Sequence, residues 1–145
     1  MNRLENTKSD VKISDITSSA THTHTIDTVG FSQASIDVAF EPVAAAGTNS
    51  AVAHVLTLQH GDTTGSFSAV TGFVAGTDYT LPTPSNTNDT NVVRFNVNLE
   101  GKRRYLRLNV TPRTDQAVAT SARLAVSENG VEDATTANVK AFVNG

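Results

Sequence analysis

Regular alternation of apolar and polar residues is the feature of this sequence that most restricts its fold. Apolar side chains fall on every second residue from Ser35 to Glu41, from Val93 to Leu99 and from Tyr105 to Val110. A period of two places the apolar side chains on one face of an extended strand and leaves the other face polar. Segments of this kind predict antiparallel sheet that is buried on one side.

The last two segments also predict a hairpin. The connection between them, Glu100 to Arg103, is short and contains Gly101. A short glycine-containing connection between alternating segments is typical of two strands that pair directly. We therefore expect Val93–Leu99 and Arg104–Val110 to be neighbours in one sheet. Pro112 should end the second strand, because proline cannot donate a hydrogen bond to a ladder.

Other segments have a weaker strand pattern. They are Thr21–Val29, Val52–His60, Ser66–Thr71, Ala117–Ser127 and Val139–Val143. The composition also indicates strands. The chain has 17 Val and 21 Thr but only 8 Leu, and such an excess of β-branched residues favours sheet over helix. About eight short strands with no helical pattern between them predict an all-β fold. We expect an antiparallel β-sandwich, with a jelly-roll-like topology preferred over an immunoglobulin-like one.

The first twenty residues differ from the rest of the chain. Their charges alternate in sign, and their few large apolar residues are Leu4, Val11, Ile13 and Ile16. Such a segment buries too little apolar surface to fold alone. It is either a disordered tail or an arm that becomes ordered on a partner, in a groove or as an added strand. We expect an extended N-terminal arm over residues 1–20 and a β-sandwich domain over residues 21–145.

The composition indicates no particular ligand. The chain has no cysteine, and its formal net charge is −3 at pH 7. Disulfides and thiolate chemistry are therefore excluded, and there is no general attraction to nucleic acid. No apolar run approaches the length of a membrane span. We expect no nucleic acid partner, no membrane partner and no cofactor.

Two groups of residues have the composition of a metal or catalytic site. His22 and His24 lie two residues apart, so on a strand both imidazoles project from one face, as two zinc ligands could. A zinc site needs three or four ligands, and no Cys, Glu or third His is nearby in the sequence. His60, Asp62 and Ser66 are the residue types of a hydrolase triad, but no nucleophile elbow surrounds Ser66. We expect no metal and no enzymatic activity.

A basic group, Lys102 with Arg103, Arg104 and Arg107, lies at the predicted hairpin. Only Tyr105 supplies an interleaved aromatic ring, and the whole chain is acidic, so nucleic acid binding is the weaker interpretation. A solvated turn or salt bridges to another subunit explain the charges better. The residues we expect to bind a partner are Leu4, Val11, Ile13, Ile16, Arg103, Arg104 and Arg107.

The predicted hairpin also carries a resemblance to a known family. The run from Gly101 to Pro112, followed by the small-residue strand Ala117–Ser127, resembles a recurrent segment of small structural proteins of tailed bacteriophages. The segments Ile36–Phe40 and Leu58–Asp62 fit the same pattern, so the resemblance covers about residues 31–127. On these residues the chain resembles capsid decoration proteins, also called cement proteins, which have a β-sandwich or jelly-roll body.

The resemblance implies a structural virion protein. Such a protein binds the outer surface of the major capsid protein lattice, often as a trimer at threefold or quasi-threefold positions, with an extended terminus that reaches across neighbouring capsomers. Its location would be the capsid outer surface, after assembly in the host cytoplasm. If trimers form, the small-faced strand Ala117–Ser127 is the expected contact.

A glycan-binding β-sandwich module is the alternative. Sugar sites usually stack rings on exposed aromatic side chains. The chain has no Trp, six Phe and only two Tyr, Tyr79 and Tyr105. The aromatic residues therefore favour the capsid interpretation, and a glycan array is the measurement that separates the two.

Overall fold

The computed structural model describes residues 7–18, 20–42, 51–84, 90–126 and 141–144. These residues form nine strands. They include no helix that could cross a membrane. The strands are β1 (Thr7–Ile16), β2 (His22–Asp27), β3 (Gln33–Phe40), β4 (Ala53–Thr63), β5 (Ser66–Val74), β6 (Asn91–Asn98), β7 (Tyr105–Pro112), β8 (Gln116–Ala125) and β9 (Ala141–Asn144).

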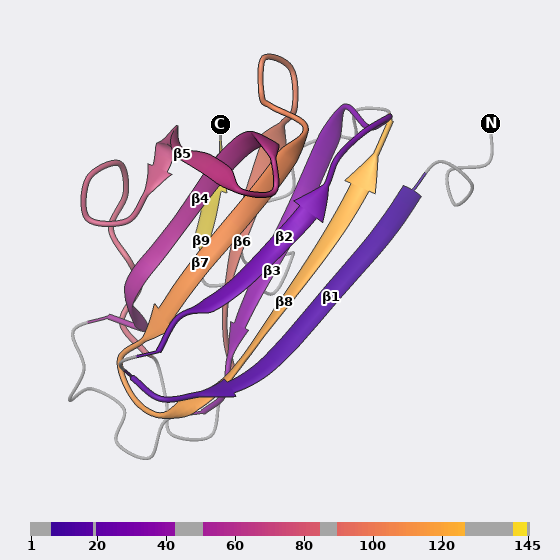
Figure 1. Cartoon of the computed structure of the whole chain (residues 1–145). Helices are drawn as coiled ribbons and strands as arrows, with labels where there is room; N and C mark the ends of the chain where they lie inside the picture. The colour runs from indigo at the N-terminus through magenta and orange to yellow at the C-terminus, as the bar shows by residue number, and fades with distance from the viewer. Residues whose placement is uncertain (1–6, 19, 43–50, 85–89, 127–140, 145) are drawn as a thin grey trace.

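The strands lie in two sheets that pack face to face (Figure 1). The larger sheet has the order β1-β8-β3-β6-β9, and the smaller has the order β2-β7-β4-β5. The first eight strands pair antiparallel in a nested order: β1 with β8, β2 with β7, β3 with β6 and β4 with β5. β9 adds parallel to β6. The predicted antiparallel β-sandwich is therefore confirmed.

The apolar faces of the alternating segments form the core between the sheets. Burial alternates strictly along β3 and β7, where every second side chain is buried. Phe73 of β5 and Phe95 of β6 meet from opposite sheets, with ring centroids 5.8 Å apart. Contact between such rings adds to the stabilisation that burying their area provides.

The predicted hairpin over residues 93–110 is wrong. β6 lies in the larger sheet and β7 in the smaller one, so the connection crosses from one sheet to the other. It turns at Gly101, whose φ is 71°, and the Lys102 N–H donates to the Leu99 carbonyl at 3.0 Å. Two strands that face each other across a core have the same alternation as two neighbours in one sheet. The pattern therefore identified both strands but not their partners.

The expectation of an extended N-terminal arm over residues 1–20 is not confirmed. Residues 7–16 form β1, which pairs with β8 along its whole length, from Thr7 opposite Ala125 to Ile16 opposite Gln116. In Figure 1 it lies along the outside of β8. The expectation relied on the scarcity of apolar side chains, whereas backbone pairing and polar contacts hold this strand. Leu4 lies outside the described residues.

Gly61 occupies a position in β4 where the neighbouring strand approaches closely. A Cβ atom at this residue would lie 2.1 Å from the Ser66 carbonyl oxygen and 3.2 Å from Cδ1 of Phe67. The register of β4 against β5 shifts between His60 and Thr63, beside this contact. A side chain at residue 61 would therefore force the backbone of β5 to move.

We predict that Gly61→Ala lowers the free energy of unfolding by about 2 kcal/mol, the usual scale for overpacking a tight site. Gly65→Ala is the control, because no atom of the described residues lies within 4 Å of a Cβ at that position. Urea unfolding of both variants measures the difference. Equal stabilities of the two variants would contradict the prediction.

Candidate functional site

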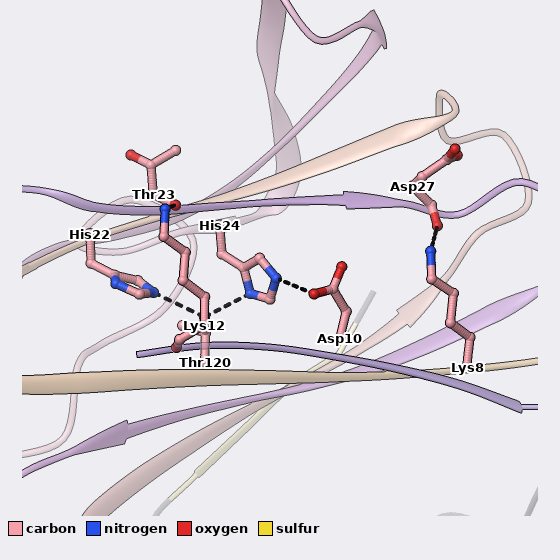
Figure 2. A network of polar contacts seen from close by, with 8 residues as sticks. All are labelled: Lys8, Asp10, Lys12, His22, Thr23, His24, Asp27 and Thr120. Atoms are coloured by element: carbon pink, nitrogen blue, oxygen red, sulfur yellow. Dashed lines mark hydrogen bonds and ion pairs between the residues drawn. The ribbon is translucent and has the colours of Figure 1, made fainter. Parts of the chain in front are cut away.

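The side of the sandwich where β1 and β2 face each other is closed by polar side chains (Figure 2). These two strands are the edge strands of different sheets. The inner face of β1 carries Lys8, Asp10 and Lys12, which contact groups of β2. None of the fully buried core residues comes from β1, and only Ile16 at its end packs partly against them. We call these contacts, together with the hydrogen bonds of His22 and His24 to Thr120 of β8, the polar clasp.

Two buried histidines of β2 share one hydroxyl group of β8. His22 and His24 are 2% and 4% exposed, and both project inward from one face, as the sequence predicted. Thr120 Oγ1 lies 2.9 Å from Nε2 of His22 and 2.7 Å from Nδ1 of His24. Nε2 of His24 lies 3.1 Å from Oδ1 of Asp10. The chain of contacts thus links β1, β2 and β8.

The Thr120 hydroxyl has one proton and three neighbouring groups that could accept it. Its Oγ1 atom contacts both imidazoles and also donates to the Lys12 carbonyl at 3.4 Å. Each imidazole nitrogen can be the donor or the acceptor, according to its tautomer. Nδ1 of His22 is buried and has no hydrogen-bond partner among the described residues. Nε2 is therefore the nitrogen through which His22 joins this network.

The pKa of His22 is lowered from 6.5 to about 4, chiefly by burial and in smaller part by the positive charge of Lys12 and by the neighbouring His24. A proton added at Nδ1 would lie in the protein interior with no acceptor among the described residues. His22 is therefore neutral at pH 7 in the folded protein. The polar clasp depends on this neutral form.

Lys8 and Lys12 extend from β1 to the backbone of β2. The Lys8 ammonium donates to the Asp27 carbonyl at 3.2 Å, and the Lys12 ammonium donates to the Thr23 carbonyl at 2.5 Å. β2 pairs only with β7 among the described strands, so its open side offers backbone groups to which another strand could add. The two lysines occupy carbonyl groups of β2 and so protect this edge.

Two of the arginines expected to bind a partner form ion pairs within the chain. Arg104 donates from Nε and Nη2 to the two carboxylate oxygens of Asp27, at 3.0 and 2.8 Å. These hydrogen bonds lower the pKa of the Asp27 carboxyl to about 2. Arg103 lies 3.6 Å from the Asp62 carboxylate, and both side chains are well exposed. Their charges are thus partly neutralised in the free protein.

The third arginine, Arg107, lies on the outer face of the smaller sheet. Its Nε and Nη2 donate to Oε1 of Gln59 at 2.9 and 2.8 Å. Its guanidinium also stacks on the Phe67 ring, 4.0 Å from the centroid. These contacts hold Arg107 flat against the sheet, where the ring attraction adds to the hydrogen bonds.

Two of the predicted apolar contact residues, Val11 and Ile13, lie on the outer face of the other sheet. Val11 and Ile13 of β1 are 58% and 70% exposed, whereas Ile16 is half-buried. Ile13 starts a row of cross-strand neighbours that crosses four strands and contains only apolar side chains: Ile13, Ala119, Ala39 and Val92. The structure thus separates the predicted residues, with Val11 and Ile13 on one outer face and Arg107 on the opposite one.

The residues of the possible triad do not form a catalytic chain. The Arg103 N–H donates to Nδ1 of His60 at 3.3 Å, and Asp62 faces Arg103 rather than His60. Ser66 is exposed at the start of β5. Within the described ranges there is also no group of three or more His, Cys, Asp or Glu residues placed to hold a metal ion.

Sequence reasoning missed the polar clasp, although a signal for it was present. Lys8, Asp10 and Lys12 share the period of two that His22 and His24 show, and a strand places all residues of such a series on one face. The partner Thr120 is 98 residues from His22, and nothing local indicates that contact. No protein-family model matches the chain, and a search of curated proteins gives no significant match.

The neutral state of His22 predicts acid sensitivity. Between pH 6.5 and pH 4 the unfolded chain binds a proton at His22 that the folded chain does not, so stability is lost as the pH falls through this window. We expect wild type to lose about 2 kcal/mol more than His22→Gln across this range. Urea unfolding at several pH values measures both slopes. If His22→Gln lost stability as steeply as wild type between pH 6.5 and pH 4, the neutral state of His22 in the folded protein would be contradicted.

A second prediction concerns the Thr120 hydroxyl that His22 and His24 share. Thr120→Val keeps the shape of the side chain but leaves two buried imidazole nitrogens without their partner, so we expect a loss of about 2 to 3 kcal/mol in unfolding free energy. Thr120→Ser keeps the hydroxyl and serves as the control. Thermal unfolding should rank Thr120→Ser above Thr120→Val, and the reverse order would show that the hydroxyl is unimportant.

Proposed function

We propose that this chain is a structural protein of a virus particle, a decoration protein that binds the outside of the major capsid protein lattice and stabilises it. The observation that carries the proposal is the outer face of the larger sheet. There the apolar row from Ile13 to Val92 lies beside exposed Val11. Contiguous apolar surface on a folded domain is characteristic of an interaction site.

The shape of this face suits attachment to a broad, flat partner. Two of the four side chains in the row, Ala119 and Ala39, are the shortest apolar ones, so another surface can approach the sheet closely. In the neighbouring row Arg94 donates to both carboxylate oxygens of Asp37, at 2.6 and 2.8 Å. The two charges balance each other and lower the cost of covering this face. Many weak contacts of this kind add up when many copies bind one shell.

The nested strand order supports the same assignment. Pairing of the first strand with the eighth, the second with the seventh and the third with the sixth is the order of a jelly roll, in which two four-stranded sheets pack together. We take the body to be a jelly roll with β9 added at one edge. This agrees with the body that the resemblance to decoration proteins implies.

The aromatic side chains favour shell binding over the glycan-binding alternative. The Tyr79 hydroxyl donates to the Leu56 carbonyl, and its ring packs edge-on against Phe95. The ring of Phe67 lies under the guanidinium group of Arg107, and the ring of Tyr105 under that of Arg104. Among the described residues these rings are therefore engaged within the chain and are poorly placed to stack on a sugar.

Co-sedimentation with empty capsid shells of the virus that encodes the chain tests the proposal. We expect wild type to pellet with the shells and Ile13→Asp to bind at least tenfold more weakly, since the substitution places a charge in the apolar row. Val55→Asp is the matched control, because Val55 is 41% exposed on the other sheet. Failure of wild type to bind, or equal losses in the two variants, would contradict the proposal.

A further inference from the structure

We infer that β1 is also the contact between two copies of this chain. In this arrangement the β1 strands of the two copies pair antiparallel across a twofold axis, with Val11 opposite Val11 of the second copy. The two larger sheets then form one continuous sheet. This contact is separate from shell binding and does not rest on it.

The open edge of β1 is suited to strand addition. β1 is ten residues long, contains neither glycine nor proline, and pairs with β8 without a register shift. The Lys12 carbonyl oxygen lies 3.4 Å from Thr120 Oγ1, so the backbone of Lys12 faces β8. Backbone groups alternate in direction along a strand, and those of Val11 and Ile13 therefore face the open edge. A long, straight edge of this kind is a template for another strand.

The edge of β2, the strand that faces β1 at this side of the sandwich, is protected against strand addition. Lysine ammonium groups already occupy carbonyls of β2. The same lysines extend from β1 toward β2 (Figure 2). Among the described strands β1 pairs only with β8, so its own other edge is open. Strand addition at this side is therefore directed to β1.

The charges of β1 fit a second copy of the same strand in one register. With Val11 on the axis, Lys12 lies opposite Asp10 of the second copy, and Asp10 lies opposite the second Lys12. Opposite charges on directly paired residues stabilise antiparallel strands. In the same register Lys8 faces the uncharged Ser14. The sequence of β1 is thus complementary to itself around Val11.

The competing register of equal length is disfavoured by the same rule. It shifts the strands so that Lys12 lies on the axis and faces Lys12 of the second copy, and like charges in direct opposition repel. Shifts by one residue would place inner side chains opposite outer ones and are excluded by the period of two. A register with Ser9 on the axis also pairs opposite charges, Lys8 with Asp10, but it overlaps only residues 7–11 of β1. The register centred on Val11 pairs opposite charges over residues 7–15, and this longer self-complementarity points to a second copy rather than an unrelated strand.

The apolar side chains agree with this register. A twofold axis perpendicular to the sheet keeps the outer faces of both copies on the same side. Val11 of each copy then covers part of the other, and the two rows that begin at Ile13 lie on one surface. Exposed side chains at 58% and 70% accessibility lose water contact in the process.

Cysteine cross-linking tests the register, because the chain has no cysteine of its own. We expect Val11→Cys to give covalent dimers with a short bismaleimide. Ile13→Cys is the register control, since residue 13 faces Ser9 and the two introduced thiols lie about 13 Å apart along the strands. Val55→Cys is the surface control on the other sheet. Cross-linking of Ile13→Cys or Val55→Cys as efficiently as Val11→Cys would overturn the proposal.

Charge substitution tests the pairing by sedimentation equilibrium. Lys12→Asp places like charges opposite each other twice per dimer and should weaken self-association about tenfold. Lys8→Asp is the matched control, because it loses an equivalent bond to a β2 carbonyl but faces Ser14 in the dimer. The double variant Asp10→Lys, Lys12→Asp restores opposite charges and should restore dimers.

Several outcomes would overturn the inference. They are a wild-type protein that stays monomeric up to millimolar concentration, equal weakening by Lys8→Asp and Lys12→Asp, and a trimer that Val11→Cys does not cross-link. The last result would favour the trimer that the resemblance implies. Shell binding by a chain that remains monomeric would overturn the dimer and leave the proposed function intact.

Discussion

The hydroxyl of Thr120 is the point on which the closed side of this sandwich depends. It lies within hydrogen-bond distance of the buried imidazoles of His22 and His24, and the His24 ring also contacts Asp10 of β1. Without it, β2 would hold two polar rings in the interior without a common partner, and burial of unpaired polar groups is costly. The edge strands of two sheets are thus joined by hydrogen bonds where a sandwich normally uses apolar side chains.

The sequence predicts the strands well and their neighbours poorly. Alternation identified β3, β6 and β7 because each has one face in the core. It could not separate β6 and β7, since strands on opposite sides of a core show the same pattern as a hairpin. β1 was missed for a different reason. Its inner face is charged, so it lacks the apolar period, and the groups that accept those charges are on β2 and β8.

The candidate site was predictable only in part. Val11 and Ile13 were expected to contact a partner, and the structure places both on an outer face with high exposure. The arginines were also expected to bind a partner, and within the chain Arg104 and Arg107 contact Asp27, Gln59 and Phe67. Those partners lie far away in the sequence, so no local pattern could reveal them. Sequence charge alone therefore overstated the basic character of the β6–β7 connection.

The pairing of β1 with β8 has a consequence for synthesis on the ribosome. β1 leaves the exit tunnel first among the described strands, but β8 is made only after six others. Until then β1 has no neighbour in its sheet. An apolar strand would be prone to aggregate during this delay. Lys8, Asp10 and Lys12, which later form the polar clasp, favour hydration of the nascent strand. The same charges thus serve first as protection from misassembly and afterwards as the closure of the finished fold.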